Sequence, residues 1–162
     1  MKAKKKSTSK DIDFMTSAER GRLLDPYRII PLIPIQPGHN VGDIGCGPGV
    51  FSIPLAKYLF SGKLYAVDIH EPMLKEITST LDSINLNNIE LNLSTENSIP
   101  IDNNVLDGVF VSCTLEEAQS PSVLLTEIKR IIKQFGWLTI ISCLTKNNDN
   151  INLEYEYIPK TK

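Results

Sequence analysis

The chain has 162 residues, which is the usual size of one domain. Its hydrophobic content of 41% and charged content of 22% are ordinary for a globular protein. No apolar run is long enough to span a bilayer. The three cysteines form no Cys-x-x-Cys pair, so they suggest neither a zinc site nor a disulfide framework. We therefore expect no metal site and a reducing, cytoplasmic location.

Charge is distributed unevenly along the chain. The first ten residues hold five lysines and no acid, whereas the rest holds 12 basic and 19 acidic side chains. A body that binds nucleic acid is normally basic, so nucleic acid is not an expected partner. We expect residues 1–12 to form a flexible lysine-rich arm and residues 13–162 to form a single domain.

The secondary structure expected in chain order begins with a helical segment over about 14–24. A short helix between the prolines of 24–38 should follow, ending in a turn at Pro37 and Gly38. Apolar strands, expected at 40–45, 63–68, 88–93, 105–112 and 137–143, then alternate with amphipathic helices. This alternation predicts an α/β fold with a mostly parallel sheet covered by helices on both faces.

Two helices show a clear apolar stripe. One follows the second strand and carries Met73, Leu74, Ile77, Leu81 and Ile84. The other should begin at Pro121 after an N-cap at Ser120 and end before Gly136. Its stripe consists of Leu124, Leu125, Ile128, Ile131, Ile132 and Phe135.

Three glycines, Gly45, Gly47 and Gly49, follow the first strand directly and are spaced two apart. Glycines at a strand-to-helix turn let the backbone approach a ligand closely, which indicates a site for a nucleotide-like cofactor. The dinucleotide fingerprint G-x-G-x-x-G needs its third glycine at position 50, but Val50 is there. A nicotinamide cofactor is therefore not favoured.

Two acids accompany this loop. Asp43 comes just before it, and Asp68 ends the second strand, 19 residues beyond Gly49. A carboxylate at the position of Asp68 can accept both ribose hydroxyls of a nucleotide. The alternative for Asp68 is an N-cap for the helix that follows.

The pattern Asp43-x-Gly45-x-Gly47-x-Gly49 resembles motif I of class I S-adenosylmethionine-dependent methyltransferases. The chain from about residue 18 to 143 is similar to small methyltransferases of the ubiquinone and menaquinone biosynthesis type (methyltransferase type 11). The resemblance implies a Rossmann-like three-layer sandwich, S-adenosyl-L-methionine (SAM) as cofactor and S-adenosyl-L-homocysteine (SAH) as product. An acid beside the loop suits SAM, which has a cationic amino group and no pyrophosphate.

The same resemblance implies the cofactor-binding residues. Asp43 and Gly45 would face the methionine amino end, Gly47 would lie close to the cofactor, and Asp68 would bind the ribose. The implied set is Asp43, Gly45, Cys46, Gly47, Gly49, Asp68, Ile69, Thr95, Glu96 and Ser112.

Within this set, Ile69 would pack on the adenine, while Thr95 and Glu96 would lie at the adenine edge. Ser112 or Cys113 would lie near the methionine moiety and the methyl group.

The sequence departs from this family at three points. Gly42 replaces a bulky apolar strand residue, which should weaken packing slightly. Thr95 stands where an aspartate commonly binds the adenine amine. The chain also ends early, so we expect six strands instead of seven, with 151–158 returning along the fifth strand after a turn at 147–150. The sheet edge left open can pair with another chain, so a homo-oligomer is a further expectation.

No catalytic residue can be assigned. Methyl transfer is an in-line displacement that depends mainly on positioning and desolvation, and a base is needed only if the acceptor is protonated. His70, Glu116 and Glu117 are candidates at the rim, although each also fits an ordinary surface position. Cys46, Cys113 and Cys143 end neighbouring strands and can converge on the ligand edge, but independent packing roles are the commoner use of cysteine.

Two functional hypotheses remain open. The first is SAM-dependent methyl transfer to a small-molecule acceptor. The second is a cofactor-binding but catalytically weak or regulatory protein that needs a partner or a lid. A nucleic-acid methyltransferase would be expected to carry an Asn-Pro-Pro-aromatic motif, which this sequence lacks.

Overall fold

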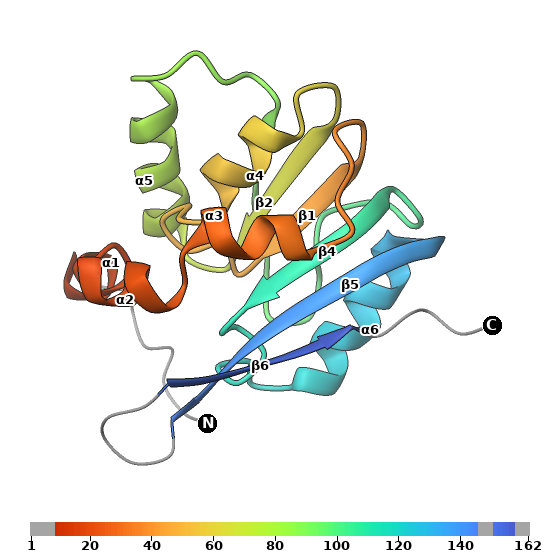
Figure 1. Cartoon of the computed structure of the whole chain (residues 1–162). Coiled ribbons are helices and arrows are strands. Elements are labelled where there is room, and N and C mark those ends of the chain that lie inside the picture. The colour runs from red at the N-terminus through yellow and green to blue at the C-terminus, as the bar shows by residue number, and fades with distance from the viewer. Residues whose placement is uncertain (1–8, 146–150, 158–162) are drawn as a thin grey trace.

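A six-stranded β-sheet forms the centre of the molecule (Figure 1). The computed structural model describes residues 9–145 and 151–157. The strand order is β3-β2-β1-β4-β5-β6, and all neighbours are parallel except β6, which runs antiparallel to β5. The strands are β1 (Asn40–Ile44), β2 (Lys63–Asp68), β3 (Ile89–Leu93), β4 (Leu106–Ser112), β5 (Ile132–Thr145) and β6 (Ile151–Tyr157). The parallel sheet and the return of the chain along the fifth strand are therefore confirmed; the expected turn at 147–150 lies outside the described residues.

The helices are α1 (Ser9–Met15), α2 (Ala18–Leu23), α3 (Pro26–Ile29), the 3-10 turn η1 (Ile30–Leu32), α4 (Ser52–Tyr58), α5 (Glu71–Leu81) and α6 (Pro121–Ile131). The segment expected as one helix over 14–24 is divided between α1 and α2. The break lies at Ser17, whose Oγ accepts the Arg20 N–H at 3.3 Å and so caps α2. Residues 1–8 of the expected arm lie outside the described part, and residues 9–12 belong to α1.

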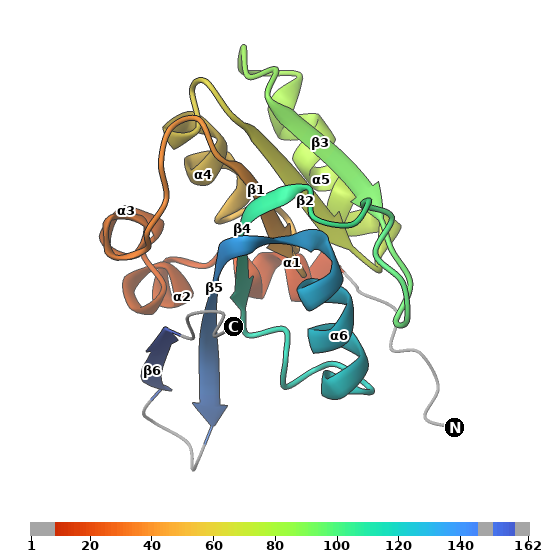
Figure 2. The ribbon, with the colours of Figure 1, turned by 90° about the vertical axis from the view of Figure 1, so that its right-hand side faces the viewer.

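Helices pack on both faces of the sheet, as Figure 2 shows for α3 and α4 on one side and α6 on the other. On the first face α3, η1 and α4 share a buried cluster with Val41, Leu64 and Phe110 from three neighbouring strands. Helix α5 joins this side through Ile77, which packs against Ala66 of β2. Removing this apolar surface from water is the main stabilising term of the fold.

The opposite face is covered by α6 together with the segment that leads into β4. This cluster contains Ile44, Val67, Ile99, Ile101, Leu106, Val109, Val111, Ile128, Ile131 and Ile132. Residues of β2 alternate between the two faces of the sheet, with Leu64 and Ala66 on the first face and Val67 on the opposite one, as the period of two along a strand requires.

The expected end of the last helix at Gly136 is wrong. Helix α6 ends at Ile131, and β5 begins at the next residue, so that Gly136 lies inside the strand. Pairing of Ile132 with Leu106 of β4 extends the strand at the expense of the helix. Phe135 therefore does not belong to a buried helical stripe, and its side chain is 84% exposed.

The slightly weaker packing expected at Gly42 of β1 is not seen. A Cβ atom at this position would come within 2.7 Å of Leu106 Cδ1, so the Leu106 side chain already fills the space. Leu106 is fully buried, and the strand is packed without a cavity at this point.

Candidate cofactor site

The loop from Gly45 to Gly49 connects β1 to α4 at the carboxyl edge of the sheet. Its three glycines have positive φ angles of 74°, 53° and 89°, a region that favours glycine. A Cβ on Gly45 would overlap the Thr114 side chain, and one on Gly49 would come within 2.8 Å of Ile77 Cγ1. Backbone conformation and close packing thus both explain this motif.

The loop is tied to the end of β2 by backbone hydrogen bonds. The N–H groups of Gly45 and Cys46 both donate to the Val67 carbonyl, at 2.8 and 3.0 Å. The N–H of Gly47 donates to Asp68 Oδ2 at 2.9 Å. Strands β1 and β4 lie side by side where the strand order reverses, which is the point at which ligands bind in open α/β sheets.

Asp43 lies beneath the loop. Its side chain is 2% exposed, and its Oδ2 accepts the hydroxyl of Ser52, the first residue of α4, at 2.6 Å. Burial raises the pKa of Asp43 to about 7, although the Ser52 hydrogen bond opposes this and the nearby charge of Asp68 adds to it. The geometry favours a role for Asp43 in holding the start of α4 against the loop.

Asp68 holds the loop from the end of β2, and the residue is buried. Its Oδ2 accepts the Gly47 N–H, and its Oδ1 accepts the His70 N–H at 2.8 Å. The His70 Nδ1 lies 3.3 Å from the same Oδ1. Each carboxylate oxygen can accept more than one hydrogen bond, so ribose hydroxyls can still be bound. Since α5 begins at Glu71, Asp68 does not cap its first turn directly.

Thr95 and Glu96 lie in a tight turn just beyond β3. The Thr95 N–H donates to the Ser98 carbonyl at 3.1 Å, and the Asn97 N–H donates to Thr95 Oγ1 at 3.4 Å. The preceding residue, Ser94, donates its N–H to the Asp68 carbonyl at 2.9 Å. The backbone therefore brings this turn next to the end of β2, where Asp68 and Ile69 lie.

The end of β4 forms the far side of the loop. Ser112 is half-buried, and the Cys113 N–H donates to the Ile141 carbonyl of β5 at 2.7 Å. Cys113 takes part in a disulfide bond, contrary to the expectation that the cysteines form none. Cys46 is free and buried, and burial raises the pKa of its thiol.

Sequence reasoning missed Thr114. Its hydroxyl donates to the Ser112 carbonyl at 3.1 Å and lies 3.4 Å from the Gly45 carbonyl oxygen. This contact joins β4 to the glycine loop across the site. A threonine just after a strand carries no sequence signal for such a role.

Helix α1 covers the loop, which was also missed. The Met15 Sδ lies 3.3 Å from where a Cβ of Gly47 would be, and Gly47 is buried. The Arg20 guanidinium lies over the Phe14 ring, 5.7 Å from its centre. Burial lowers the pKa of Arg20, while the charge of Glu117 opposes that shift. The N-terminal helices and the segment after β4 thus meet at the rim of the site.

A shallow groove lined by Ala56, Lys57, Phe60, Leu86, Asn87 and Asn88 lies at the end of α4, away from the predicted site residues. Among the residues that the structure describes, no three His, Cys, Asp or Glu side chains are grouped as metal ligands. Within the same ranges, no helix is long and apolar enough to cross a membrane.

The chain is similar to known proteins in both sequence and structure. Residues 42–140 match the family model Methyltransf_11, described as a methyltransferase domain. The crystal structure of a SAM-dependent methyltransferase from Aquifex aeolicus is similar with a TM-score of 0.82 and 31% identity, covering 90% of this chain and 78% of that one.

Curated relatives are longer than this chain. A demethylmenaquinone methyltransferase of Listeria welshimeri is 29% identical over 121 residues, which is 74% of this chain and 50% of that protein. An uncharacterised methyltransferase of Schizosaccharomyces pombe is 28% identical over 102 residues, 59% of this chain and 37% of that protein. The chain thus spans half or less of the length of these two relatives. With the glycine loop, the strand order and the family match together, the chain belongs to the SAM-dependent methyltransferases of the type 11 family.

Proposed function

We propose that this chain binds SAM against the glycine loop and transfers the methyl group to a small-molecule acceptor. The observation that carries the proposal is the hydrogen bond between the glycine loop and Asp68. Three glycines with positive φ form the turn at the carboxyl edge of the sheet, and Asp68 Oδ2 accepts the Gly47 N–H at 2.9 Å. Family membership supports the reaction class.

Each end of the cofactor has a proposed partner. Asp68 binds the ribose hydroxyls, and Ile69 packs on the adenine ring. Thr95 and Glu96 contact the edge of the adenine ring. The methionine end then extends past the loop toward Ser112. Asp43 is only 2% exposed, so it acts on the methionine end indirectly. It holds the loop, and its carboxyl group contributes to the electrostatic field there.

The chemistry needs little from side chains. The acceptor atom attacks the methyl carbon as the bond from that carbon to sulfur breaks, and the cationic sulfonium becomes the neutral thioether of SAH. If the acceptor is protonated, its proton leaves to water or to a rim base, for which His70 and Glu117 are nearby. Positioning and exclusion of water supply most of the rate in such a step. The cover that Met15 and α1 place over the loop suits this requirement.

A small-molecule acceptor is supported by the likeness to demethylmenaquinone methyltransferase, at 29% identity. The acidic balance of residues beyond the lysine-rich start also disfavours a nucleic acid as acceptor. A homo-oligomer through the edge of β6 stays a prediction, to be tested by the molar mass in solution.

The proposal is tested by release of SAH from SAM in the presence of a panel of small phenolic, quinol, amine and thiol acceptors. We expect turnover with at least one class and its loss in Asp68→Ala. A matched control is Lys63→Gln, which breaks the 2.6 Å ion pair with Glu90 at the opposite edge of the sheet. Binding of SAH without turnover on any acceptor would instead favour the regulatory alternative.

A further inference from the structure

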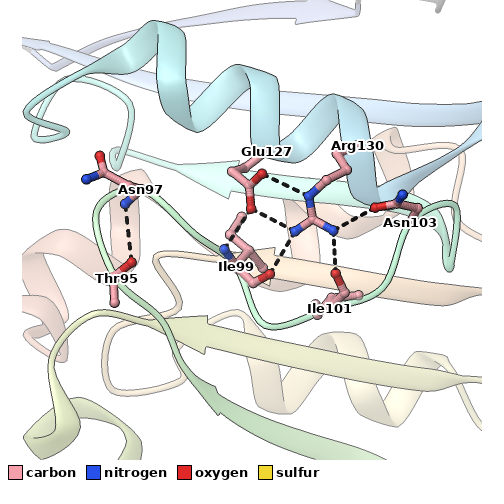
Figure 3. A network of polar contacts seen from close by, with 7 residues as sticks. All are labelled: Thr95, Asn97, Ile99, Ile101, Asn103, Glu127 and Arg130. Carbon is pink, nitrogen blue, oxygen red and sulfur yellow. Dashed lines mark hydrogen bonds and ion pairs between the residues drawn. The ribbon is translucent and has the colours of Figure 1, made fainter.

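An ion pair on α6 reaches across to the segment between β3 and β4. Arg130 donates through Nε to Glu127 Oε1 at 2.8 Å and through Nη2 to Glu127 Oε2 at 2.7 Å (Figure 3). This two-point geometry fixes the plane of the guanidinium. The hydrogen bonds from Arg130 lower the pKa of Glu127, so the pair is charged on both sides at neutral pH.

The remaining donors of Arg130 all point into that segment. Nη2 donates to the Ile99 carbonyl at 2.8 Å, and Nη1 donates to the Ile101 carbonyl at 2.7 Å and to Asn103 Oδ1 at 3.0 Å. Glu127 completes the arrangement by accepting the Ile99 N–H at 2.9 Å. Figure 3 shows these groups converging on one guanidinium. We call Glu127 and Arg130 together the α6 clamp.

The clamp holds the end of the turn that carries the proposed adenine-binding residues. That turn runs from Thr95 to Ser98, and Ile99 follows it directly. Its other end is held where the Ser94 N–H donates to the Asp68 carbonyl at 2.9 Å. The turn is therefore fixed on one side by the cofactor-binding strand β2 and on the other by the α6 clamp.

A purely stabilising role explains these contacts less well. The side chains of Arg130 and Glu127 are 31% and 16% exposed, and partly exposed ion pairs contribute little stability on their own. The buried side chains of Ile99 and Ile101 already attach the segment to α6. The clamp additionally sets the path of the backbone just after the turn, because three of its bonds go to backbone groups of Ile99 and Ile101.

We propose that Glu127 and Arg130 are positioning residues for cofactor recognition, which place Thr95 and Glu96 at the adenine edge. The inference rests on the proposed function, since it assumes that SAM binds at this edge. It predicts that disturbing the clamp affects recognition of the adenine base and leaves the binding of ribose and the methionine moiety unchanged.

The test compares two ligands by calorimetry. SAH carries the adenine amine, whereas S-inosylhomocysteine has a carbonyl oxygen in its place and a hydrogen on N1 of the base. The ribose and homocysteine parts of the two ligands are the same. We expect the wild type to prefer SAH. Arg130→Gln, Arg130→Lys and Glu127→Gln should weaken SAH binding by about tenfold, because a small displacement of a binding group is costly. Their affinity for S-inosylhomocysteine should stay near that of the wild type. The ratio of the Kd for S-inosylhomocysteine to the Kd for SAH should therefore fall toward one.

Lysine is expected to fail at position 130 because its ammonium has three donors on a single atom and cannot reproduce the five hydrogen bonds that the planar Arg130 guanidinium makes. Lys63→Gln, which also loses a 2.6 Å ion pair but at the far edge of the sheet, should keep the wild-type preference. Thermal unfolding of each variant shows that it is folded at the temperature of the titration. If Arg130→Gln does not fold, Glu127→Gln and Arg130→Lys carry the test.

The possible outcomes distinguish failure of the proposed function from failure of the α6 clamp proposal. A wild type that binds neither ligand contradicts the proposed function itself. A wild type that binds SAH and S-inosylhomocysteine equally well overturns the adenine-edge assignment and the clamp with it. Variants that bind both ligands more weakly, with the wild-type preference retained, would show that the clamp only stabilises the fold.

Discussion

Asp43 should make the free protein less stable as pH rises. Its carboxyl group is 2% exposed and its pKa is raised from 3.8 to about 7, mainly by burial. The folded state therefore binds this proton more tightly than the unfolded state. Stability from this group is greatest below about pH 4, decreases as the unfolded state ionises, and is at its minimum above pH 7. A difference of about three pKa units corresponds to a loss of about 4 kcal/mol.

The variant Asp43→Asn removes this dependence while keeping the size of the side chain. We expect its free energy of unfolding, relative to wild type, to improve by about 3 kcal/mol between about pH 4.5 and pH 8. Urea titration can follow Trp137, the one tryptophan of the chain, which is 5% exposed. Ser52→Ala, which removes the hydrogen bond that lowers the Asp43 pKa, should steepen the wild-type trend. A difference between Asp43→Asn and wild type that does not change with pH would refute the reasoning.

Two further predictions concern the loop and α4. Gly45→Ala should abolish SAH binding and lower stability by about 1–3 kcal/mol, because φ is +74° and the new methyl group would overlap Thr114. The control is Gly21→Ala in α2, where a Cβ would have no atom within 4 Å, and this variant should raise stability by about 0.5–1 kcal/mol. Equal changes in the free energy of unfolding of the two variants, measured by urea titration, would contradict the prediction. Asn88→Ala should cost about 1–2 kcal/mol, because Asn88 Nδ2 donates to the carbonyl of Ala56 in α4 at 2.9 Å and to that of its C-cap Leu59 at 2.7 Å. An unchanged thermal midpoint would show that solvent replaces these bonds.

The parallel core could be predicted from sequence because its signals are local. The strands are short apolar runs, and the amphipathic helix α5 follows the second of them. The glycine loop is equally readable, because three alternating glycines after a strand require positive φ angles that the structure shows. Pro54 lies in the first turn of α4, where its missing N–H costs little.

The junction between α6 and β5 could not be predicted in the same way. The apolar residues from Ile128 to Ile132 suit both a helical and an extended backbone, and pairing with Leu106 of β4 decides between them. Gly136 was read as a helix stop because glycine commonly follows a helix, whereas here it lies within β5. Long-range pairing overrides a local signal of this kind.

Only part of the candidate site could be predicted from the sequence, because the rest depends on long-range contacts. Its acids and glycines lie in one motif and at one strand end. The residues that complete it come from distant segments: Met15 lies over Gly47, Thr114 packs against Gly45, and Arg130 holds the turn after β3. Each of these contacts joins segments that are far apart in the sequence. The burial of Asp43 behind the loop is also a product of packing.

The most direct test of the proposed cofactor site is calorimetric binding of SAM and SAH, with NAD as control, to the wild type and to Asp68→Ala. We expect the wild type to bind SAM and SAH but not NAD, and Asp68→Ala to bind neither. A ligand present at 100 times its Kd should also stabilise the wild type by about 2.7 kcal/mol, which a thermal shift would reveal. Unchanged SAM binding in Asp68→Ala, or no binding in the wild type, would contradict the assignment of this loop and acid as the cofactor site.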